Sequence, residues 1–72
     1  MNGPPRLGDV IALPAWIKAG PIRVLDVRPD PIPGWLQVDG YDIHRLPRTE
    51  RTYRVPLRQL RRGPDPTYRD TP

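Results

Sequence analysis

Arginine side chains are the groups in this sequence best suited to bind a ligand. Five of them lie close together in the second half of the chain: Arg45, Arg48, Arg51, Arg54 and Arg58. Pro47 prevents a helix from aligning them, because proline lacks an N–H donor and has a fixed φ, so we expect them to project from a loop and a strand. A forked guanidinium group suits phosphate or carboxylate ligands. The cluster therefore predicts contacts to the phosphates of a nucleic acid, with little sequence preference.

The positive charge is concentrated in the C-terminal part of the chain. Residues 1–44 contain four basic and five acidic residues, whereas residues 45–72 contain eight arginines and three acidic residues. Eleven of the twelve basic residues are arginine. A coding sequence rich in G and C is an alternative explanation for the abundance of arginine and proline. It does not explain why the arginines cluster, and this clustering favours an anionic partner.

Aromatic side chains near the arginines could stack on nucleobases, and Trp35 and Tyr53 are the candidates for this role. Trp35 has the strand parity opposite to that of Leu36 and Val38, so we expect it to be exposed. The alternative is structural, since an indole can also pack on the prolines before it and hold that loop. Trp16, which lies in a predicted loop, is expected to cover one open end of the domain.

Catalysis and metal binding find little support in the sequence. The chain has no cysteine or serine, which excludes disulfides, thiolate metal sites and the usual nucleophiles. His44 with Asp42 is a candidate acid–base pair, but a solvated loop histidine is the simpler interpretation. No glycine-rich phosphate loop is present. We therefore predict a protein that is not an enzyme, with no cofactor and no metal.

Twelve prolines in 72 residues exclude most helices, and the remaining pattern is that of short strands. Alternating or β-branched segments predict strands at residues 9–13, 22–27, 35–39 and 51–55. Two leucines three residues apart predict a 3₁₀ turn at residues 57–60, followed by a short edge strand at 61–62. The change of parity after Val38 predicts a bulge with an unpaired Gly40.

Three stretches give this chain a resemblance to a known architecture: Gly8-Asp-Val-Ile, Arg23-Val-Leu-Asp-Val-Arg, and Tyr53-Arg-Val-Pro-Leu-Arg-Gln-Leu. They resemble the small SH3-like barrels of the Tudor-like and KOW-like kind, although the glycine-centred KOW motif itself is absent. The resemblance implies an all-β fold, a small SH3-like barrel of about five short strands with a 3₁₀ turn before the last strand. We expect a flexible N-terminus at 1–7, the barrel at 8–62 and a disordered tail at 63–72. An OB-like barrel is the alternative.

The same resemblance implies a binding module for nucleic acid or for a protein segment. Nucleic acid, either DNA or RNA, is the first expectation for the partner. The alternative is a protein partner, bound in an aromatic and proline-lined groove or along an exposed edge strand, and the aspartates could meet a basic partner. Without a long apolar run or a signal-peptide core, we expect a cytoplasmic monomer that does not enter a membrane.

Overall fold

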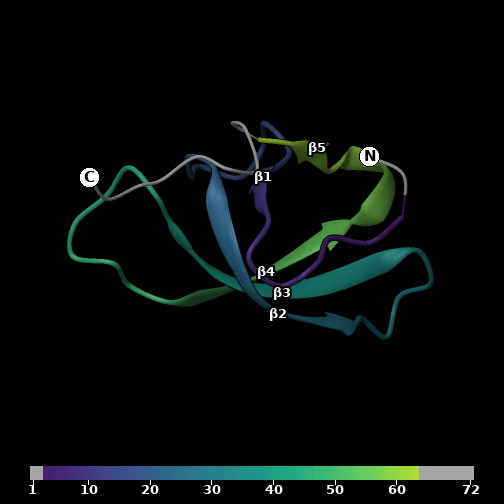
Figure 1. Ribbon diagram of the computed structural model, residues 1–72. Helices are drawn as coiled ribbons and strands as arrows, with labels where there is room; N and C mark the ends of the chain where they lie inside the picture. The colour runs from purple at the N-terminus through teal and green to yellow at the C-terminus, as the bar shows by residue number, and fades with distance from the viewer. Residues whose placement is uncertain (1–2, 64–72) are drawn as a thin grey trace.

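Five antiparallel strands and one 3₁₀ turn make up the fold of residues 3–63, which are the residues described by this computed structural model (Figure 1). In chain order the elements are β1 (Val10–Ala12), β2 (Ile22–Pro29), β3 (Trp35–Asp42), β4 (Arg51–Pro56), η1 (Leu57–Gln59) and β5 (Arg61–Arg62). The all-β class is thereby confirmed, as is the 3₁₀ turn before the last strand. The predicted strands at 22–27 and 35–39 are longer than expected and continue to Pro29 and Asp42.

The strands form one sheet in the order β4-β3-β2-β1-β5. In Figure 1 the long strands β2 and β3 bend, so that β1 and β5 lie across the molecule from β3 and β4. Because the sheet curls, its two edge strands, β4 and β5, lie around a common core. Ile11 from β1 and Leu60 after η1 thus join Val38 and Val55 in one buried cluster.

Strand alternation explains which side chains are buried. Ile22, Val24, Val38 and Val55 point into the curled sheet and are at most 1% exposed. Leu36 shares the parity of Val38 but is only half-buried and packs at the margin of the core. The inner face is therefore apolar, and the outer face of β2, β3 and β4 carries polar and charged side chains.

The sheet contains the expected bulge, but the prediction of its position was wrong. Gly40 is paired on both sides, with Val24 and with Arg51. The register shift instead lies in β2, between Val24 and Asp26, so that Leu25 is the extra residue. Leu25 follows the inward-pointing Val24 and is 41% exposed, and the bulge allows Asp26 to be exposed as well.

The remaining domain predictions concern the ends of the chain. Near the N-terminus, Pro5 is buried and the Gly8 N–H donates to the Val24 carbonyl at 2.8 Å. The predicted disordered tail, 63–72, lies outside the described residues except for Gly63, whose N–H donates to Val10. Within residues 3–63 the structure contains no helix that could cross a membrane.

Candidate functional site

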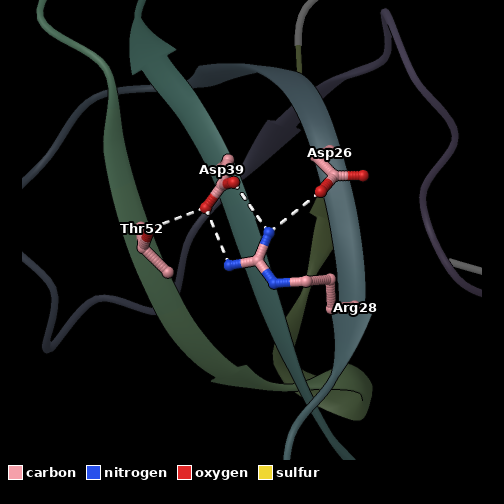
Figure 2. Close-up of polar contacts among 4 residues, drawn as sticks. All are labelled: Asp26, Arg28, Asp39 and Thr52. Carbon is pink, nitrogen blue, oxygen red and sulfur yellow. Dashed lines mark hydrogen bonds and ion pairs between the residues drawn. The ribbon is translucent and has the colours of Figure 1, made fainter.

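The outer face of the sheet carries an ion-pair network that joins β2, β3 and β4 (Figure 2). The Arg28 guanidinium donates to Asp39 at 2.7 and 3.2 Å and to Asp26 at 2.9 Å. Thr52 donates its hydroxyl to the same Asp39 carboxylate at 2.6 Å. These donors, Arg28 first and Thr52 second, hold the pKa of Asp39 below its usual value. With two carboxylates around one guanidinium, this network carries a net negative charge and does not attract phosphate.

Arg54 is also held by a carboxylate on the outer face. Its Nε and a terminal nitrogen donate to the two oxygens of Asp30 at 2.6 and 2.9 Å. Asp30 also accepts hydrogen bonds from the Gln37 side chain and the Ile32 N–H. The Arg54 hydrogen bonds are the main reason why the pKa of this fully covered carboxylate lies far below its ordinary value. Arg54 thus anchors the β2–β3 loop to β4.

A cationic hollow lies where the β1–β2 loop meets the β3–β4 loop, and its volume is about 450 Å³. Of the described residues that line it, Lys18, Arg45 and Arg51 supply three positive charges, and Asp42 supplies the one carboxylate. Tyr53 also lines the hollow. Two formal positive charges therefore remain beside an aromatic ring, in a space large enough for a small anionic group. The lining residues that complete the wall are Ala19, Leu46, Pro47 and Thr49.

Asp42, the last residue of β3, connects the two loops that form the cationic hollow. Its Oδ2 accepts the Gly20 N–H and its Oδ1 accepts the His44 N–H, each at 2.8 Å. Burial opposes ionisation of this carboxyl, but these two amide donors outweigh it and keep its pKa below the usual value. Arg45 lies 3.8 Å from the same carboxylate. Asp42 thus ties the β1–β2 loop to the β3–β4 loop, and Lys18 and Arg45 line the same hollow.

Arg48 also belongs to the β3–β4 loop, but its side chain packs against another residue, Tyr41. Its guanidinium carbon stands 5.4 Å from the ring centre of Tyr41, in a cation–π arrangement. Arg48 does not line the cationic hollow. The β3–β4 loop therefore presents a second cation–aromatic pair near the hollow, built on the end of β3.

A second hollow, the tryptophan groove, lies at the other end of β4 and has a volume of about 550 Å³. It is lined by Pro33, Gly34, Trp35, Pro56, Leu57 and Arg58. Trp35 and Pro56 are cross-strand partners, which places the indole beside the proline ring. The ring centre of Trp16 is 6.3 Å from that of Trp35, and the Trp16 indole N–H donates to Gln59 at 2.9 Å. Trp35 is consequently half-buried rather than exposed as predicted.

The seven residues predicted to contact nucleic acid do not line one hollow. Arg45, Arg51 and Tyr53 line the cationic hollow, and Trp35 and Arg58 line the tryptophan groove. The other two are engaged elsewhere, Arg48 over a tyrosine ring and Arg54 with a carboxylate. The predicted set is thus divided between two hollows and two contacts with other side chains.

Sequence reasoning missed Lys18, which comes from a proline-bounded loop 27 residues before Arg45. No local pattern places it beside the arginines, because the contact depends on Asp42 tying two loops together. The signal that could have found it is the Asp42 side chain at a strand end, a common position for a carboxylate that accepts loop amides.

Comparisons of this chain with protein-family models, with curated proteins and with solved structures found no match.

Proposed function

We propose that this domain is a non-catalytic module that binds nucleic acid through the cationic hollow. Lys18, Arg45 and Arg51 contact phosphates, and Tyr53 offers an aromatic surface within the same hollow. Such contacts follow the backbone and select little sequence. The all-β fold and the resemblance to SH3-like barrels agree with a binding role.

One observation carries this proposal: three cations line one hollow, and the only carboxylate that residues 3–63 contribute to its lining already accepts two backbone amides. Lys18 and Arg51 form no ion pair with any carboxylate described between residues 3 and 63. Both are exposed, so a phosphate can approach them without first displacing an internal partner. Arg54 and Arg28, by contrast, would have to leave carboxylates to bind phosphate.

The salt dependence of binding tests this proposal. Each phosphate contact on a single strand lowers log K by roughly 0.7 per tenfold increase in salt, so three contacts give a slope of about −2. Between roughly 50 and 200 mM salt the affinity should then fall by about tenfold to twentyfold. Fluorescence anisotropy with a labelled oligonucleotide measures both the affinity and the slope.

Arg51→Gln should weaken binding and make the slope shallower by about 0.7, because one contact is lost. Arg62→Gln is the matched control, since it removes the same charge from β5, which lines neither hollow. Circular dichroism checks that both variants fold. A flat salt response, absence of binding at low salt, or equal effects of the two substitutions would contradict the proposal.

A further inference from the structure

The tryptophan groove combines features that recognise an unpaired base rather than an extended peptide. The Trp35 indole and the rings of Pro33 and Pro56 give flat apolar walls. Gly34 leaves the space above it open, since a Cβ there would meet nothing within 4 Å. Stacking on such a surface is available to every base, because each base has a π face.

Among residues 3–63, the one charged residue that lines the groove is Arg58. Arg58 is exposed, and no carboxylate described between residues 3 and 63 forms an ion pair with it. None of the described residues that line the groove is acidic. The charge of the groove thus complements a phosphate attached to a stacked base.

An extended peptide would need main-chain hydrogen-bond partners, and the lining residues offer few. The two prolines have no N–H, the Trp35 N–H donates to Ile32, and the Leu57 N–H donates to the Gly34 carbonyl. The indole N–H of neighbouring Trp16 is occupied by Gln59. A ligand that relies on stacking and on one cation fits these walls better than one that relies on backbone pairing.

The groove and the cationic hollow lie at the two ends of β4, which is an edge strand of the sheet. Arg51 begins β4 and Pro56 ends it. Five intervals of about 3.3 Å separate these residues, so the two sites are roughly 17 Å apart along the strand. A nucleic-acid strand rises about 3.4 Å per nucleotide, and about five nucleotides span this distance.

We propose that the tryptophan groove is a base-stacking site for single-stranded nucleic acid, with Trp35 against the base and Arg58 on its phosphate. This inference rests on the proposed function, because the same nucleic-acid strand continues along the β4 edge to the cationic hollow. An oligonucleotide of about three nucleotides reaches one site, and one of about eight reaches both.

The test compares oligothymidylates of about three and about eight nucleotides with a duplex of the longer length, at low salt. The probe is the indole emission of Trp16→Phe, in which Trp35 is the remaining tryptophan. The longer strand should bind about tenfold more tightly than the shorter one and should quench Trp35. The duplex, whose bases are stacked already, should bind without quenching.

Arg58→Gln should weaken the longer strand about threefold or more, because that strand loses its phosphate contact in the groove. Arg62→Gln again supplies the matched loss of charge. If both strands bind equally and the Trp35 emission does not change, the base-stacking site is refuted while the proposed function stands. If no oligonucleotide binds, both fail. Quenching of Trp35 by a proline-rich peptide but not by the longer strand would also overturn the site.

Discussion

Gly40 is the position where a single added carbon should most disturb the sheet. It lies opposite Val24 in β2, directly beside the bulge at Leu25. A Cβ at Gly40 would press into the carbonyl oxygen of Arg23 and would stand 3.2 Å from Cδ1 of Ile22. Gly40 does not have a positive φ, so the penalty comes from space rather than from backbone conformation.

The size of the effect follows from what would have to move. The main obstacle to the new Cβ is backbone, so β2 itself must shift away from β3, and their pairing joins the two halves of the core. Overpacking of this kind costs about 1–3 kcal/mol. A domain of about 60 residues has a total stability of roughly 3–9 kcal/mol. Each kcal/mol lowers Tm by about 4–8 °C at this size, so Gly40→Ala should melt about 5–20 °C below the parent protein.

Thermal melting followed by circular dichroism, with urea unfolding in parallel, measures this loss. Gly34 supplies the contrast, because its φ is +82° and there is open space around it. Gly34→Asn should keep most of the stability, since asparagine tolerates the left-handed region, whereas no side chain fits at Gly40. A Gly40→Ala variant that melts within about 2 °C of the parent protein would refute the close approach of β2 and β3.

Two further predictions concern the acid response and the core. The pKa of Asp30 is lower in the folded protein than in the unfolded chain, so the unfolded state takes up protons first and stability should fall as the pH drops below about 4. Asp30→Asn should flatten this dependence in melting experiments between about pH 2 and 6, and an unchanged acid profile would exclude the ion pair as its cause. Val24→Ala should lower the free energy of unfolding in urea by about 2–3 kcal/mol, because Val24 is 1% exposed. Leu36→Ala should lower it by less than the truncation of a fully buried leucine does, because Leu36 is half-buried. If Leu36→Ala lost as much stability as the truncation of a fully buried leucine, the observed packing would be contradicted.

Much of the fold could be predicted from local pattern. Prolines excluded helices, alternation located the strands, and two leucines three residues apart located η1, because each of these features depends only on backbone geometry within a few residues. The position of the bulge was not predictable in this way. The extra residue lies in β2, and its position is set by the pairing of β2 with β3 rather than by the pattern of β3 that suggested Gly40.

The charged residues show the same division. Composition and residue order are enough to show that positive charge and guanidinium groups gather in the C-terminal part of the chain. The folded arrangement was needed to show that Arg54 is bound to Asp30, while Arg45 and Arg51 line a hollow with Lys18. An ion pair is set by distances across the sheet and between loops, and those distances follow from strand register and loop closure rather than from spacing along the chain.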